Sequence, residues 1–288
     1  MALVNNDTYL LITPLKDEVR YIGTCIQSVV DQVHPPSLWI IVDDGCTDGS
    51  ADVVREWMDS HPWIELLSLE KGEWDLGIHY SEVCMKGFDR AISRAREETI
   101  DWQFIGLLDA DIRLDPEYFR DLQKEMQVDD KLGIASGHLA EPGKDGTGKP
   151  RINENNPMGG ARLWKRKCFD SAQYVSSFAP DSVSNVKARL GGWTTRLFPN
   201  ITGEQLRAMG ESHGRCQGAI LWGRSSHFLG SGPLFALLKG LKLLTRFPCY
   251  PGLCYLRGYF TSFLMRREQI ADAEVIEYYA HRKLRDYL

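Results

Sequence analysis

Three clusters of acidic residues each follow a short apolar run. The first lies in Thr13-Pro-Leu-Lys-Asp-Glu18, the second in Asp43-Asp-Gly-Cys-Thr-Asp-Gly49 and the third in Asp109-Ala-Asp111. In open α/β sheets, ligands bind beyond the carboxyl ends of the strands. Three carboxylate clusters at one such edge would repel one another. We therefore expect a cation, or hydrogen-bond donors from a ligand, to balance them there.

The third cluster has the clearest chemistry. Asp109 and Asp111 flank a small residue, Ala110, so two carboxylates leave a strand at alternate positions. Oxygen ligands of this kind suit a hard divalent ion that also touches phosphate oxygens. The alternative is that these carboxylates only cap neighbouring backbone.

The elements that must position these carboxylates alternate along the first 140 residues. Apolar runs predict strands, and stripes with helical spacing predict helices between them. The strands are expected at 9–13, 38–43, 64–69 and 104–108, and the helices at 18–33, after a cap at Ser50, at 83–95 and after Pro116. This order predicts a doubly wound, Rossmann-type, mostly parallel sheet flanked by helices. After 133–137 the regularity fades, apart from a loop at 141–157 and a helix after Asp181.

The composition limits the classes of protein. The chain has 288 residues, of which 43% are hydrophobic, enough for one large α/β domain or two small fused ones. The net charge of −5 argues against a nucleic-acid partner. Seven cysteines without a C-x-x-C pair predict reduced thiols in a cytoplasmic protein, and no signal peptide is expected.

The segment 228–264 is the most apolar part of the chain. Lysines, arginines and a proline interrupt it, so it is too charged to cross a bilayer, yet apolar and basic enough to lie on one. The alternative is a helical pair packed on the core. This segment suggests peripheral association with the inner face of a membrane.

The order and spacing of three motifs resemble a family 2 glycosyltransferase of the GT-A fold. They are Val42-Asp-Asp-Gly-Cys-Thr-Asp-Gly-Ser50, Leu107-Leu-Asp-Ala-Asp111 and the acceptor-side segment Gly159-Gly-Ala-Arg-Leu-Trp-Lys-Arg166, and the likeness covers roughly residues 8 to 200. The resemblance implies a nucleoside pocket lined by Pro14, Asp17 or Glu18, and Asp43. Asp44 would hold the following turn or help bind the base, two roles that we leave open. Asp109 would face the ribose or the metal, and Asp111 would hold Mg²⁺ or Mn²⁺ against the diphosphate.

The same resemblance suggests further groups. Lys71, Arg207 and Arg215 are candidates to contact the phosphates, although each suits an ordinary solvated surface position. Relatives often carry a metal-site histidine where this chain has Gln205, and His213 is a nearby substitute. Asp181, at the start of a helix, is the candidate general base for an inverting transfer, and its alternative role is to cap that helix.

These expectations define a function and a domain plan. Residues 1–229 would form the transferase domain, with a nucleotide-binding half at about 8–135 and an acceptor half at about 136–229, followed by a helical extension at 230–288. The donor would be a nucleoside-diphosphate sugar, with UDP favoured by the resemblance, and the acceptor a glycan, polysaccharide or glycolipid hydroxyl. The loop 141–157 would close over the donor.

Other readings of the motifs are weaker. An Asp-nucleophile phosphohydrolase would carry its Asp-x-Asp on the first strand, and a sugar nucleotidyltransferase would carry a glycine-rich loop after it. A degenerate, non-catalytic sugar-binding module would be expected to lose members of the acidic set, and this chain keeps them.

Overall fold

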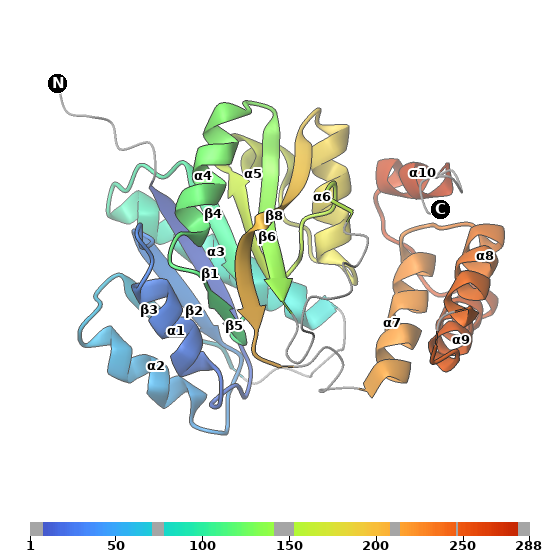
Figure 1. Ribbon diagram of the computed structural model, residues 1–288, viewed down its shortest axis with the longest axis horizontal. Coiled ribbons are helices and arrows are strands. Elements are labelled where there is room, and N and C mark those ends of the chain that lie inside the picture. The colour runs from blue at the N-terminus through green and yellow to red at the C-terminus, as the bar shows by residue number, and fades with distance from the viewer. Residues whose placement is uncertain (1–7, 71–77, 141–152, 208–213, 246, 282–288) are drawn as a thin grey trace. The chain divides into compact units, whose positions relative to one another are not determined.

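The fold is seen in a computed structural model that describes residues 8–70, 78–140, 153–207, 214–245 and 247–281 (Figure 1). The chain divides into two compact units. The first comprises 1–176 and 187–207, and the second comprises 177–186 and 208–288. Helix α7 therefore belongs to the second unit, so this unit begins earlier in the sequence than the expected extension from 230.

The first unit is built on one eight-stranded sheet in the order β3-β2-β1-β4-β7-β6-β8-β5. Strands β3, β2, β1 and β4 are parallel, whereas β7 runs antiparallel to β4 and β6, and β5 runs antiparallel to β8. The strands are β1 (Tyr9–Leu15), β2 (Leu38–Asp43), β3 (Ile64–Ser68), β4 (Phe104–Leu108), β5 (Ile112–Leu114), β6 (Leu132–Ala140), β7 (Ala161–Lys165) and β8 (Thr194–Gln205). The predicted mostly parallel sheet is confirmed.

Two hydrophobic clusters cover the two faces of the sheet. Alternate residues of β1 point to opposite sides, so Leu11 joins one cluster and Ile12 the other. Helices α1 (Ile22–Val30), α2 (Ser50–Met58) and α4 (Tyr118–Val128) pack into the first cluster, and α3 (Ile78–Glu97) and α5 (Arg166–Ala172) into the second. Because both faces are covered, β1, β2 and β4 are buried almost throughout, as their unbroken apolar runs predicted.

The second unit is helical. It contains α7 (Gly214–Phe228), α8 (Pro233–Leu244), α9 (Tyr250–Leu264) and α10 (Ala273–Ala280), together with the first turns of α6 (Pro180–Leu190). Tyr255 and Tyr259 of α9 are its most buried aromatic residues, and Tyr255 packs edge-on against Trp222 of α7. Within the described residues, no helix is long and apolar enough to cross a membrane.

Two expectations about local chemistry were wrong. Cys216 of α7 and Cys254 of α9 form a disulfide, so the cysteines are not all reduced thiols. These residues are 38 positions apart and meet only because α7 and α9 pack closely. Ser50 is the first residue of α2 and not its cap; the cap is Gly49, and the Ser50 hydroxyl accepts from the Glu18 backbone amide instead.

Candidate functional site

The acidic clusters meet at one edge of the sheet because of strand register. Leu15 of β1 lies opposite Asp43 of β2, and Ile12 of β1 lies opposite Leu107 of β4. The chain leaves all three neighbouring strands at their carboxyl ends within a few residues of these pairs. The residues expected to bind a donor thus emerge side by side along β2, β1 and β4, where an open α/β sheet binds its ligand.

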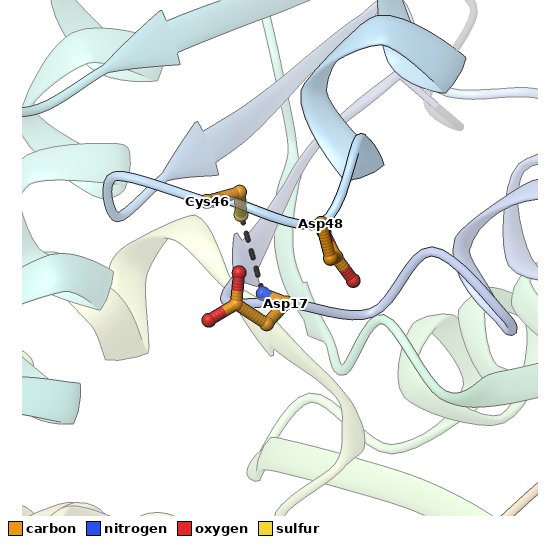
Figure 2. A group of neighbouring side chains, drawn as sticks. All are labelled: Asp17, Cys46 and Asp48. Carbon is orange, nitrogen blue, oxygen red and sulfur yellow. Dashed lines mark hydrogen bonds between the residues drawn. The ribbon is translucent and has the colours of Figure 1, made fainter.

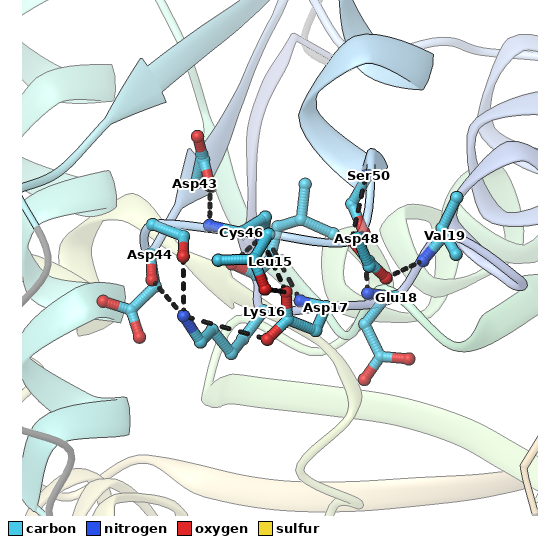
Figure 3. Close-up of polar contacts among 12 residues, drawn as sticks. Leu15, Lys16, Asp17, Glu18, Val19, Asp43, Asp44, Cys46, Asp48 and Ser50 are labelled. Atoms are coloured by element: carbon cyan, nitrogen blue, oxygen red, sulfur yellow. Dashed lines mark hydrogen bonds and ion pairs between the residues drawn. The ribbon is translucent and has the colours of Figure 1, made fainter.

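The loops after β1 and β2 are tied together by backbone contacts (Figure 3). Lys16 Nζ donates to the carbonyls of Asp44 and Gly45, each at 2.8 Å. The Asp43 carboxylate accepts from the Cys46 amide at 2.8 Å and from the Ser68 hydroxyl at 3.3 Å. It is therefore Asp43 that closes the turn after β2, a role that we had considered for Asp44. Gly45 has a φ of 65°, a left-handed backbone that favours glycine in this turn.

Asp17, Cys46 and Asp48 form a small group on the same loops (Figure 2). The Asp17 carboxylate accepts from the Thr47 amide at 2.7 Å, and the Asp48 carboxylate accepts from the Val19 amide at 2.9 Å and from Ser50. Burial raises the pKa of the Cys46 thiol to about 12. The hydrogen bonds of this group link the loop after β1 to the loop after β2.

The Asp48 carboxylate is strongly hydrogen-bonded within this group. Burial acts to raise the pKa of its carboxyl group, but the hydrogen bonds from Ser50 and the Val19 amide outweigh burial and leave the pKa below its ordinary value. The anionic Asp48, in the loop after β2, thus binds the backbone of the loop after β1 through the Val19 amide.

Two consecutive residues of α3 contact two of the predicted carboxylates. His79 Nε2 lies 2.8 Å from Asp44 Oδ2 and 2.9 Å from Asp44 Oδ1, and the Tyr80 hydroxyl donates to Asp109 Oδ1 at 2.7 Å. Asp44 is therefore oriented by an imidazole and does not hold the turn. Because His79 and Tyr80 are neighbours, they bring the acidic ends of β2 and β4 under the same helix start.

Among the described residues, Arg207 is the cation that contacts the carboxylates of Glu18 and Asp111. Its guanidinium donates to Asp111 Oδ2 from Nε at 3.1 Å and from Nη2 at 3.0 Å, and Nη2 also donates to Glu18 Oε1. Burial raises the pKa of Glu18, against the lowering effect of Arg207. Burial lowers the pKa of Arg207, but its two carboxylate partners outweigh burial and raise it. Asp111 and Glu18 thus share one guanidinium from within the chain.

The position of Arg207 follows from sheet pairing. Strand β5 begins directly after Asp111 and pairs antiparallel with the end of β8, with Ile112 opposite Gln205. The Leu206 amide donates to the Asp111 carbonyl at 2.7 Å and continues this ladder past the strand end. Arg207 is the next residue, so the register that places Gln205 beside Ile112 brings the arginine beside Asp111.

Gly160 lies against Asp109 at the other side of the site. Its carbonyl accepts from the Asp109 amide at 2.7 Å, and a Cβ at Gly160 would lie 2.8 Å from Asp109 Oδ2. A side chain there would push against the carboxylate, so the glycine keeps Asp109 in place. Gly160 belongs to the segment 159–166 that we had associated with the acceptor, and it also shapes the end of β4.

The remaining candidate residues have different outcomes. Pro14 is half-buried near the end of β1, and Arg215 is exposed at the start of α7. Lys71 and His213 lie outside the described residues, as does most of the loop 141–157. Asp181 is the second residue of α6, in the first turn of the helix and within the second unit. The catalytic role of Asp181 stays a prediction.

The donor atoms of Asp109 and Asp111 fit a divalent cation. Both residues offer hard oxygen ligands, the type that Mg²⁺ and Mn²⁺ prefer. The guanidinium of Arg207 lies beside Asp111, so a metal there would compete with it for this carboxylate. The assignment of a metal to these two residues stays a prediction.

The fold and this edge define a class of protein. A family model described as Glycosyl transferase family 2 matches residues 10–185, and the chain belongs to that family. Among named proteins, the chain is 38% identical over 61 residues to TuaG of Bacillus subtilis, named as a teichuronic acid biosynthesis glycosyltransferase; the match spans 21% of this chain and 24% of TuaG.

Solved structures show the same fold. The mannosyltransferase PcManGT from Pyrobaculum calidifontis, in complex with GDP-Man and Mn²⁺, superposes with a TM-score of 0.61 at 16% identity and covers 92% of this chain and 89% of that one. Residues 1–349 of S. aureus TarS, in complex with UDP-GlcNAc, give a TM-score of 0.56 at 12% identity and cover 90% and 73% of the two chains. At these identities the likeness establishes the fold.

Proposed function

We propose that this protein transfers a sugar from a nucleoside-diphosphate sugar to an acceptor hydroxyl, with inversion at the anomeric carbon. The observation that carries the proposal is the meeting of Glu18, Asp44, Asp109 and Asp111 at the carboxyl ends of β1, β2 and β4. Family membership and the nucleotide sugars held by PcManGT and TarS support it.

The three acidic clusters have two different tasks in this proposal. The loops after β1 and β2, fixed by Lys16 and Asp43, would receive the nucleoside, with ribose hydroxyls or base N–H groups donating to carboxylates there. Asp109 and Asp111 would hold Mg²⁺ or Mn²⁺, which supplies charge neutralisation for the departing diphosphate. Tyr80 and Gly160 contact the Asp109 carboxylate, and Arg207 would contact a phosphate group once it leaves Asp111.

The transfer itself needs a base and an in-line nucleophile. We assign the base role to Asp181, whose carboxylate would accept the proton of the acceptor hydroxyl. The acceptor oxygen would form its bond to the anomeric carbon from the side opposite the diphosphate, while the bond from that carbon to the diphosphate oxygen breaks and its electron pair leaves with the diphosphate. A single displacement of this kind inverts the anomeric centre.

The donor base and the acceptor are further parts of the proposal. UDP-GlcNAc and GDP-Man both occur among the fold relatives. We favour a UDP sugar from the family resemblance, and the local match to a teichuronic acid biosynthesis enzyme favours an acceptor in a glycan, polysaccharide or glycolipid. A lipid-linked acceptor would bring the enzyme to a membrane surface.

Calorimetric titration of UDP and GDP, with and without Mn²⁺, tests the donor site. We expect one nucleotide to bind in a metal-dependent way to the wild type, and binding to be lost in Asp111→Asn. Asp101→Asn is the matched control, because Asp101 precedes the amino end of β4, has a side chain 76% exposed and pairs only at the surface with Arg166. If neither nucleotide binds under any metal condition, a non-catalytic module becomes the better description.

A further inference from the structure

The helical segment 214–267 is strongly basic. It contains eight basic residues and no aspartate or glutamate: Arg215, Arg224, Lys239, Lys242, Arg246, Arg257, Arg266 and Arg267. The other 26 of the chain's 34 lysines and arginines share the rest of the sequence with all 39 acidic residues. A protein with a net charge of −5 therefore concentrates positive charge in one segment, a pattern that indicates an anionic partner.

The same segment exposes many large apolar side chains. In α8 the exposed residues Leu234, Leu237 and Leu241 follow one helical stripe, and in α9 Tyr250, Leu253 and the basic Arg257 follow another. Phe247, in the connection between the two helices, is 98% exposed. Contiguous apolar residues that are exposed on a protein surface usually mark an interaction site.

Helix geometry places the two stripes on one side of the α8–α9 hairpin. The helices pack through glycines: a Cβ at Gly240 would lie 2.2 Å from Leu256, and one at Gly252 would lie 2.8 Å from Leu244. Gly240 and Gly252 mark the side of each helix that faces the other. At 3.6 residues per turn, the exposed stripe of each helix is rotated about 100° from that side, in the same direction when each helix is viewed from its amino end. The short connection makes the helices antiparallel, so equal rotations in each bring both stripes to the same side.

Helix α7 covers the opposite side of the hairpin. It meets α9 where Gly258 faces the Ile220 carbonyl and Gly223 faces the Tyr255 carbonyl, and the Cys216–Cys254 disulfide joins the two helices. Lys239 points into this packed side, with its ammonium 3.8 Å from the centre of the Trp222 ring. The hairpin therefore has a packed side and an exposed apolar side, the latter carrying Arg257 and followed by the exposed Arg266 and Arg267.

We propose that this apolar side, here called the α8–α9 face, docks on the surface of an anionic lipid bilayer. Helices of 12 and 15 residues are too short to span the hydrocarbon core but can lie in the interface, with leucine and aromatic side chains inserted. The arginines would meet lipid phosphates at the headgroup level. A second copy of the same face is a poor partner, because the pairing would bring two basic, acid-free surfaces together.

Vesicle co-sedimentation of the full chain tests this proposal without any donor or acceptor, so its outcome is independent of the transferase proposal. We expect binding to phosphatidylcholine vesicles that contain phosphatidylglycerol, and weaker binding to phosphatidylcholine alone. Changing Arg257, Arg266 and Arg267 to Gln should weaken binding to the anionic vesicles by about fivefold per charge. High salt should have a similar effect.

The apolar contribution is tested by a triple variant, Leu241→Ser, Phe247→Ser and Leu253→Ser, which should lower vesicle binding by about tenfold or more. Val128→Ser is the matched control, because Val128 of α4 is 87% exposed and lies outside the face. Wild-type chain that stays in the supernatant with every vesicle overturns the proposal. So does a triple variant that binds as well as wild type, or a wild type that dimerises through this face.

Discussion

Arg207 offers the sharpest test of the site. It is the cation that Asp111 and Glu18 share, and a divalent metal proposed at Asp111 would compete with it for the same carboxylate. Replacing Arg207 with Gln keeps much of the side-chain volume and removes the charge. The variant should be less stable than wild type without metal, and it should bind Mn²⁺ more tightly in the absence of nucleotide.

The size of the expected stability loss follows from the burial of these three side chains. The side chains of Asp111 and Glu18 are 9% and 12% exposed, and that of Arg207 is 26% exposed. Removing one partner of a fully buried pair costs about 3–5 kcal/mol, whereas an exposed pair contributes about 0–1 kcal/mol. For this intermediate cluster we expect a loss of about 2 kcal/mol. If Mn²⁺ displaces Arg207 in the wild type, the same 2 kcal/mol makes Mn²⁺ binding by the variant about thirtyfold tighter.

The stability loss of Arg207→Gln should depend on pH in a definite direction. Burial already raises the pKa of Glu18, and without the lowering effect of Arg207 this pKa rises further. A carboxyl group whose pKa is raised by folding contributes stability below its ordinary pKa, and that stability is lost as the pH rises through the folded-state pKa. The stability deficit of Arg207→Gln should therefore be larger near about pH 8 than near about pH 5.

Urea denaturation at both pH values measures the deficit, and Mn²⁺ calorimetry without nucleotide measures the affinity. Arg113→Gln is the control, because Arg113 forms an exposed ion pair with Glu204 on the neighbouring β5–β8 pair, and its loss should cost less than about 1 kcal/mol. Unchanged or weaker Mn²⁺ binding by Arg207→Gln would refute the competition argument. Arg207 would then support the metal site rather than occupy its place.

Two other substitutions test separate parts of the site. Asp181→Asn should lower kcat by about 10²–10⁴-fold and leave calorimetric nucleotide binding unchanged, if Asp181 is the general base; a kcat close to that of wild type would remove it from that role. Gly160→Ala should weaken metal-dependent nucleotide binding by about tenfold, because its Cβ would lie 2.8 Å from Asp109 Oδ2, and cost about 1–3 kcal/mol of stability by urea denaturation. Gly218→Ala in α7, where a Cβ meets nothing within 4 Å, should be neutral or slightly stabilising.

Sequence patterns were most informative where strands are buried on both faces. Strands β2 and β4 begin and end at the predicted residues, because every position from Leu38 to Asp43 and from Phe104 to Leu108 is buried and all but the last residue of β2 and the glycine of β4 are large and apolar. The carboxylates that follow these strands were found for the same reason, since the strand ends fix their place.

Strands β5 and β8 gave no such signal. Residues along β8 vary between buried and exposed and include a proline and an asparagine, so neither an apolar run nor a strict alternation appears. Strand β5 has only three residues. Their pairing joins segments about ninety residues apart, and the placement of Arg207 beside Asp111 depends on it. The partner of Asp111 was therefore out of reach of any local pattern.

His79 and Tyr80 were missed for a related reason. The third helix was predicted from its apolar stripe, which begins at Val83, whereas α3 begins at Ile78. In the first turn the apolar Ile78 is exposed and the polar Ser81 is buried, so the apolar periodicity does not extend to it. A helix whose first turn faces a ligand edge will often lose its apolar stripe there, and the polar residues just before such a stripe are worth examining as site residues.

The acidic edge also shows which contacts a charge argument from sequence leaves out. The clustered carboxylates led us to expect a cation or donors supplied by a ligand. The structure adds contacts from within the chain: His79 contacts Asp44, and Arg207 joins Glu18 to Asp111. Glu18 and Asp111 thus already share a cationic partner, so a metal at Asp111 would have to exchange this contact for its own. Because a metal–diphosphate pair presents both signs of charge, it can take the carboxylates from Arg207 and give the guanidinium a phosphate in return. Free metal offers no such replacement, and we therefore expect metal and nucleotide to bind this edge together better than either binds alone.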